Sequence, residues 1–201
     1  MIKISTQSFI KSLVLGSSFL FASYSANAQT PASLNSIGTP WIQNFDNLAN
    51  SGTGHTLSII GLVMSETGSS ANAFYQAGAG TLATGDVWSF GNTSATERAL
   101  GTIRSNNLIP TIGATLINQT GVTITQLHIE YEGEFWRCGA TGRRDSLMFQ
   151  YSLDATDLTT GTWTDVVALN FKTPHTAGPT GAIDGNQPVN GTIISSTITG
   201  I

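Results

Sequence analysis

The chain has 201 residues, a formal net charge of −4, and charged side chains at only 10% of its positions. Apart from the neighbours Arg143 and Arg144, its eight basic residues form no patch that could neutralise a phosphate backbone, so a nucleic-acid partner is not expected. The single cysteine, Cys138, excludes an internal disulfide. In an exported protein, a lone thiol suggests burial or pairing with another chain.

The N-terminus has the three parts of a secretory signal peptide. Lys3 and Lys11 give a short basic start, and residues 13–22 form an apolar run that is too short to read as a membrane span. The small residues of Ala26-Asn27-Ala28 then match an A-x-A cleavage site. We therefore predict export of the chain and removal of this leader.

The predicted cleavage after Ala28 divides the chain into two parts. Residues 1–28 are the signal peptide, and residues 29–201 form one mature domain of about 170 residues, long enough for a real core. No second long apolar stretch follows, so no membrane span is expected in the mature chain. The predicted location is secreted, extracellular or at the cell surface.

Short segments with the period-2 pattern of β-strands follow one another from residue 41 onward, separated by turn residues. Residues 66–86 interrupt them with a long loop rich in Gly, Ala and Ser, which is functional or mobile at that length. In chain order, strands are predicted at residues 41–45, 57–64, 87–91, 98–101, 111–118, 123–135, 146–152, 163–171 and 192–198.

Residues 123–135 show the clearest alternation. Three glutamates share one face of this predicted strand with His128, while large apolar residues occupy the other face. Residues 146–152 alternate in the same way, so the two segments are expected to be neighbouring strands that face one core. The core-facing residues are Leu127, Ile129, Tyr131, Phe135, Leu147, Phe149 and Tyr151.

No segment sustains the 3.6-residue apolar period of a helix. Eight or more short strands with regular turn signals are typical of a sandwich or jelly roll. The predicted fold class is therefore all-β, an antiparallel β-sandwich of jelly-roll type.

Several sequence words, found together, resemble one known family. They include GDVWSFG, LINQTGVTITQLHIEYEGEFWRCG and LMFQYSLDAT, which contain the motifs E-x-W-R-x-G and Q-Y-S-x-D. Over residues 38–201 the chain is similar to bacterial extracellular β-sandwich domains found in secreted and surface proteins that carry sorting tails of the PEP-CTERM or type 9 secretion kind. The function of this family is unassigned, so the resemblance implies architecture and location rather than an activity.

The chain departs from this family at two places. Family members more usually have Asn at the position of Cys138, and they continue beyond the segment that ends here at Ile201. The resemblance therefore implies one of two alternatives: the sequence is a fragment, or the last C-terminal strand of the sandwich is lacking and one sheet edge is left unpaired.

Three interpretations apply to Glu130, Glu132 and Glu134. Alternate residues of a strand lie about 7 Å apart, which falls in the range of about 6.5 to 9.5 Å between the carboxyl groups of inverting glycosidases. The same stripe could bind a cation. The leading interpretation is a solvated strand face, because catalysis also needs a cleft and a carboxyl group with a raised pKa.

The end of this strand supplies the candidate ligand-binding residues. Trp136 could stack on a sugar ring while Arg137 and Glu134 bind its hydroxyl groups, and Trp88 is a second candidate ring. Alternatively, Glu134 and Arg137 form an ion pair across a bend at Gly133, and Trp136 packs in the core. The second alternative is favoured, because a Trp at such a position is more often a packing residue.

Three aspartates are candidate cation ligands. Asp154 and Asp157 lie in one predicted turn and Asp184 lies in another. Turn capping by carboxylate oxygens is the leading interpretation for these residues, and Ca²⁺ is the one cofactor considered. The three histidines lack the spacing of a zinc site.

The leading hypothesis for function is a secreted, non-catalytic surface module with a structural or adhesive role. A carbohydrate-binding module that uses exposed aromatic rings is the alternative, and a polysaccharide hydrolase or lyase is a further one. The expected partners are extracellular polysaccharide or other surface proteins.

Overall fold

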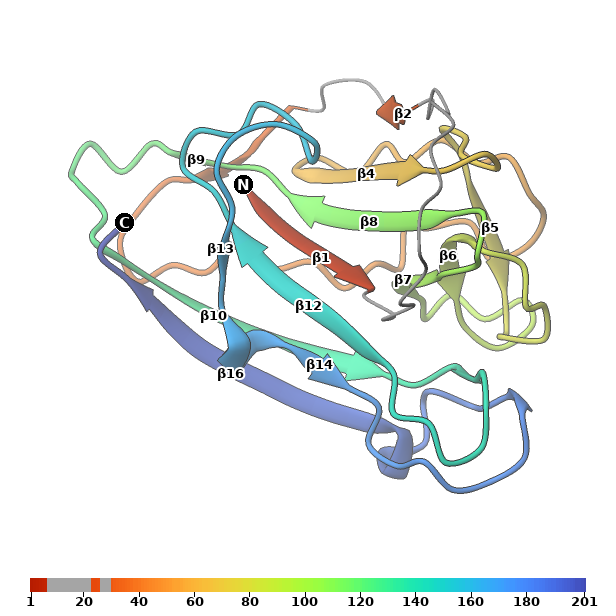
Figure 1. Cartoon of the computed structure of the whole chain (residues 1–201). Coiled ribbons are helices and arrows are strands. Elements are labelled where there is room, and N and C mark those ends of the chain that lie inside the picture. Colours follow the sequence, from red (N-terminus) through yellow and green to blue (C-terminus); the bar gives the residue numbers. More distant parts are fainter. Residues whose placement is uncertain (7–22, 26–29) are drawn as a thin grey trace, which may run out of the picture.

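A computed structural model describes residues 1–6, 23–25 and 30–201. This part of the chain is all-β, with sixteen strands, two one-turn 3-10 helices and no α-helix (Figure 1). The elements are β1 Ile2–Thr6, β2 Ser23–Ser25, β3 Ala32–Leu34, β4 Leu62–Thr67, β5 Tyr75–Gly78, β6 Asp86–Phe90, β7 Ala99–Ile103, β8 Ile109–Ala114, β9 Leu116–Asn118, β10 Gln126–Glu134, β11 Arg137–Cys138, β12 Ser146–Tyr151, β13 Thr164–Asp165, η1 Val167–Leu169, β14 Phe171–Lys172, β15 Gly181–Ala182, η2 Pro188–Asn190 and β16 Gly191–Thr199.

The largest sheet has seven strands in the order β13-β12-β1-β8-β4-β2, with β14 also paired to β12. Every pairing in this sheet is antiparallel. The N-terminal strand β1 lies in the middle, between β8 and β12, as the red arrow in Figure 1 shows. The sheet therefore joins the first residues of the chain to segments more than 100 positions away.

Four smaller sheets complete the fold: β5-β6-β7, β3-β9, β11-β15 and β10-β16. Two of their pairings, β5 with β6 and β3 with β9, are parallel. The pair β10-β16, called the ribbon below, is antiparallel over nine residue pairs from Gln126↔Thr199 to Glu134↔Gly191. The fold class is thus all-β with several sheets that are mostly antiparallel.

The alternation predicted for residues 123–135 is confirmed. The polar residues of β10 are exposed from Gln126 to Glu132, and the apolar residues between them are half-buried. These apolar residues do not pair with β12; they meet it face to face in one core. That core contains Ile129, Tyr131, Phe135, Cys138, Leu147, Phe149, Tyr151, Leu169, Phe171, Ile194 and Ile198.

Two further apolar clusters fill the other half of the molecule. One gathers around Leu57, Met64 and Val87, which are almost completely buried. The other is a stack of the aromatic rings of Trp88, Phe90 and Trp136.

Four predicted strands differ from the observed structure. Residues 111–118 are divided at Thr115 into β8 and β9, which belong to different sheets. Residues 41–45 form no strand, and Phe45 adopts a positive φ of 63° before a turn. The predicted strand at 57–64 begins only at Leu62, because Gly61 has φ 84° and lies so close to Ala32 that a Cβ would be 2.6 Å from its side chain. Residues 163–171 are divided by η1, whose Leu169 is buried. The segment predicted as a long loop, 66–86, contains β5.

The predicted leader is described only in part. Its first residues form β1 and residues 23–25 form β2, whereas residues 7–22 and the cleavage site at Ala28 lie outside the described residues. Within the described ranges, no helix is long and apolar enough to cross a membrane.

Candidate functional site

The outer face of the ribbon is polar except for the exposed Ile193, which lies opposite Glu132. The strand register places His128 beside Thr197, with Nδ1 3.2 Å from Oγ1, and places Glu130 beside Ser195. Carboxylate, imidazole, amide and hydroxyl groups therefore alternate across two strands on one face. Its exposed polar residues are Gln126, His128, Glu130 and Glu132 on β10, and Ser195, Thr197 and Thr199 on β16.

The position of Glu130 and Glu132 on this face bears on catalysis by carboxyl groups. A general acid needs a carboxyl group that is withdrawn from water. Both side chains are instead exposed on the outer face of the ribbon. Their arrangement is suited to hydrogen bonding and charge complementarity with a partner.

Glu130→Gln and Glu132→Gln are each expected to change the free energy of unfolding by about 0.5 kcal/mol or less, as surface substitutions do. Urea melts of the two variants beside the unchanged chain measure this. If a variant kept its stability but lost hydrolysis of a polysaccharide, the interpretation of Glu130 and Glu132 as non-catalytic would be wrong.

At the end of β10, Glu134 turns inward. The indole Nε1–H of Trp136 donates to Glu134 Oε2 at 2.6 Å. Burial raises the pKa of Glu134, the hydrogen bond from Trp136 opposes this shift, and the charges of Glu97, Glu132 and Asp184 add to it. Glu134 therefore holds the Trp136 ring in place from within the structure.

The structure corrects the expected ion pair between Glu134 and Arg137. The chain bends at Phe135 and Trp136, and Arg137 begins the next strand, β11. Its Nη1 donates to the carbonyl oxygens of Gly80 and Thr81, at 2.7 and 3.1 Å. Arg137 thus binds the segment that follows β5 instead of pairing with a carboxylate.

Trp136 and Trp88 are only 3% and 2% exposed. The Trp136 ring stacks on Phe90 with centroids 6.1 Å apart, and Gly185 lies so close to the indole that there is no space for a Cβ. Both tryptophans are core residues, so neither presents a ring face to a sugar in this structure.

Asp154 and Asp157 lie in the loop between β12 and β13, and Asp184 lies in a different turn. Asp154 accepts hydrogen bonds from Ser152 Oγ and from the backbone N–H of Thr162, both at 2.8 Å. Asp157 accepts from Thr159, and Asp184 accepts from Gln187. These hydrogen bonds, led by the backbone N–H of Thr162 for Asp154, lower the pKa of all three carboxyl groups.

Cation coordination by these aspartates is not supported by a cluster of ligands. In the part of the chain that the structure describes, no three His, Cys, Asp or Glu side chains come together as a metal site. The turn hydrogen bonds therefore give the aspartates a structural role, and no cation site is assigned to them.

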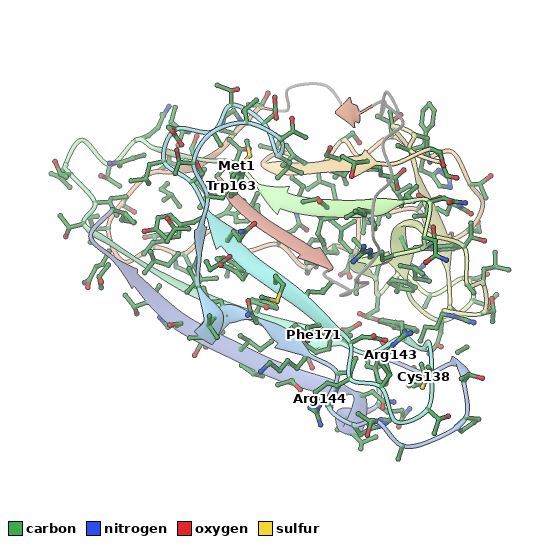
Figure 2. The ribbon with its side chains drawn as sticks, in the orientation of Figure 1. Met1, Cys138, Arg143, Arg144, Trp163 and Phe171 are labelled. Carbon is green, nitrogen blue, oxygen red and sulfur yellow. The ribbon has the colours of Figure 1, made fainter. Side chains whose placement is uncertain are left out.

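Cys138 is buried in the core beneath the ribbon and is only 1% exposed. Figure 2 labels it near the end of the molecule where Arg143 and Arg144 lie. Arg143 pairs with Asp145 through two hydrogen bonds of 2.6 and 2.8 Å, and Arg144 donates to the carbonyl oxygen of Thr173. Of the two interpretations of the thiol, burial is the one that the structure shows.

A buried pair of carboxyl groups, Glu66 and Asp86, is absent from the residues singled out by the sequence. Glu66 is fully buried and accepts the backbone N–H groups of Asn72 at 2.9 Å and Val87 at 3.0 Å. Asp86 accepts a hydrogen bond from Gln76 and shares one with Glu66. Burial raises the pKa of both groups, that of Glu66 to about 7.

This pair predicts a pH-dependent stability. Because the folded chain raises the pKa of Glu66 above 4.5, it holds a proton that the unfolded chain loses, and stability falls as the pH rises from about 4.5 to about 7. In urea melts at pH 5 and pH 8, Glu66→Gln should remove most of this pH-dependent loss. Equal losses in the variant and the unchanged chain would contradict it.

One apolar cavity of about 220 Å³ lies at the end of the core beneath the ribbon. Leu116, Leu127 and Ile198 line it, and Met1 reaches it from the start of β1. Figure 2 labels Met1 at that end of the large sheet. The cavity is therefore on the inner side of β10, away from the exposed glutamates.

Comparison with known proteins gives no relative for this site. No family model matches the chain, and no curated protein or solved structure matches it. The proposals below therefore depend on the geometry of the described residues.

Proposed function

We propose that the chain is an exported, non-catalytic module with a structural or adhesive role outside the cell or at its surface. The β-sandwich of jelly-roll type and the relationship to bacterial extracellular sandwich domains are parts of this proposal. In support of the sandwich, side chains of β12 and of the ribbon meet in one core from separate sheets.

The observation that carries the proposal is the two-faced ribbon. Its inner face supplies Ile194 and Ile198 to the core, while its outer face presents carboxylate and hydroxyl groups at alternate pairs of the nine. Ile193, opposite Glu132 near one end of this face, is 63% exposed. Mixed polar and apolar exposure over two long strands suits contact with another macromolecule.

Extracellular polysaccharide is the second candidate partner. The hydroxyl groups of Ser195 and Thr197 beside the carboxylate of Glu130 provide donors and acceptors at strand spacing. Because Trp88 and Trp136 are buried, this form of the proposal uses hydrogen bonds across the ribbon instead of stacked rings.

The experiment compares the full chain with a ribbon variant, Glu130→Gln/Glu132→Gln/Ile193→Ser. The probes are immobilised alginate, xylan, cellulose and chitin, and a surface coated with the chain itself. We expect saturable binding to at least one probe, weakened at least tenfold in the ribbon variant. Asp165→Asn, which changes an exposed carboxylate on β13, is the matched control and should bind like the unchanged chain.

Two results would contradict the proposal. One is the absence of binding to every probe by a folded chain. The other is equal binding by the ribbon variant and the unchanged chain, which would place the contact surface elsewhere.

A further inference from the structure

The middle of the largest sheet is filled by a strand from the predicted leader. Residues 2–6 pair with β12 on one side and residues 2–5 with β8 on the other, both antiparallel. The sheet order leaves β8 and β12 with no pairing to each other, so β1 is the connection between them (Figure 1).

Removal of the leader would therefore divide this sheet. After cleavage at Ala28 both β1 and β2 are lost, and β8 and β12 each keep an edge of unpaired N–H and C=O groups. Such edges are sites at which another strand is added. The inference rests on the proposed export, because cleavage is what vacates the position.

The register fixes the chemistry of a strand that fits this position. Ile4 lies opposite Phe149 on one side and Ile112 on the other, which are 2% and 6% exposed. The next position, Lys3, lies opposite Gln150 and Gly113. A fitting strand therefore carries an apolar residue between the two buried side chains and alternates with polar ones.

The cavity beneath the ribbon lies beside the start of β1 and could hold one side chain of a strand bound between β8 and β12. Met1 lines this cavity together with Leu116 and Leu127, and its nitrogen donates to the carbonyl oxygen of Ser152 at 2.6 Å. An incoming strand can therefore place one apolar side chain in the cavity while its backbone continues the pairing with β12.

We propose that the space between β8 and β12 is a strand-accepting groove that, once the leader is removed, binds an extended segment of another protein chain. The bound segment runs antiparallel to both strands, with an apolar residue at the cavity and apolar residues at the positions of Ile2 and Ile4. In the uncleaved chain the leader occupies the groove itself. Main-chain hydrogen bonds on both sides supply affinity, and the alternate apolar positions supply specificity.

The test uses the full chain with a protease recognition sequence added at one position within residues 7–22. The folded chain is cleaved at this site, and an acetylated, fluorescent peptide of residues 1–8 is added in excess while its anisotropy is followed. A second peptide has an unrelated sequence, in which a leading leucine is followed by alternating valine and threonine. A third carries Ile4→Pro, which removes a backbone donor.

We expect the first two peptides to bind the cleaved chain with affinities within tenfold of each other, and the Ile4→Pro peptide to bind at least tenfold more weakly. The uncleaved chain is the control, and it should bind all three at least tenfold more weakly because its groove is occupied. The ribbon variant should bind the peptides normally, which separates this inference from the proposed contact surface.

Three results would overturn the inference. Equal binding of the Ile4→Pro peptide would show that no strand is added. Binding of the residue 1–8 peptide alone, without the alternating peptide, would restrict the groove to the leader. Dimers of the cleaved chain that take up no peptide would show that a second copy fills it.

Discussion

Arg98→Met is expected to lower the free energy of unfolding by about 3 kcal/mol, measured by urea melts. Arg98 is 1% exposed, and its guanidinium donates to Ser89 Oγ at 2.9 Å and to the carbonyl oxygens of Ser89 and Asn92. Methionine fills similar space but leaves buried acceptors without donors, at a cost of about 1–3 kcal/mol each. Relief of the buried charge offsets part of this loss.

Arg98→Lys is the matched control for charge. Lysine keeps the cation but cannot reproduce the planar fork of donors, and Gly91 lies so close to the guanidinium that little space is left for rearrangement. We expect the lysine variant to lose about 2 kcal/mol, between the methionine variant and the unchanged chain. A methionine variant as stable as the unchanged chain would show that these hydrogen bonds contribute nothing net.

Trp136→Ala is expected to destabilise the chain by about 3–5 kcal/mol, the range for a large aromatic removed from a core. The indole is 3% exposed, stacks on Phe90 and hydrogen-bonds to Glu134. Thermal and urea melts measure the loss. Without the ring, the buried part of Glu134 also loses its donor.

Trp163→Ala is the control for Trp136→Ala. Trp163 is half-buried, and its Nε1–H donates to the carbonyl oxygen of Thr160. Its removal should cost about 1 kcal/mol, because less apolar surface is uncovered. If the Trp136→Ala variant kept its stability but lost binding to a polysaccharide, Trp136 would have to bind the sugar directly, and its assignment as a core residue would be wrong.

The parts of the fold that the sequence predicts are those with a strong local pattern. The alternation of residues 123–135 predicts both faces of β10, because burial of every second residue leaves a direct trace in the sequence. Breaks at Gly61 and around η1 are harder to predict, since they depend on close packing against Ala32 and burial of Leu169. Those contacts join distant parts of the chain.

The position of β1 follows from long-range pairing alone. Residues 2–6 carry a local pattern that fits a signal peptide, and nothing in it indicates β8 or β12, which follow more than 100 residues later. Strand pairing at such separation depends on edges supplied by the rest of the fold.

The candidate site could be predicted only where the exposure of a side chain follows from its alternate position along a strand. The exposed glutamates of β10, Glu130 and Glu132, are of this kind. The partners of Glu134 and Arg137 are not, because the bend after β10 directs one side chain to Trp136 and the other to Gly80. Glu66 and Asp86 stand at the two ends of the segment predicted as a loop, and two carboxylates at these positions are a weak sequence signal of the buried pair, which β4 and β6 bring together.

The N-terminal sequence of the chain recovered outside a secreting bacterial host tests export and cleavage together. Both the surface role and the strand-accepting groove depend on export and cleavage. We expect a mature protein that begins at Gln29, with the leader absent. Recovery of the chain only inside the cell, with Met1 intact, would contradict it.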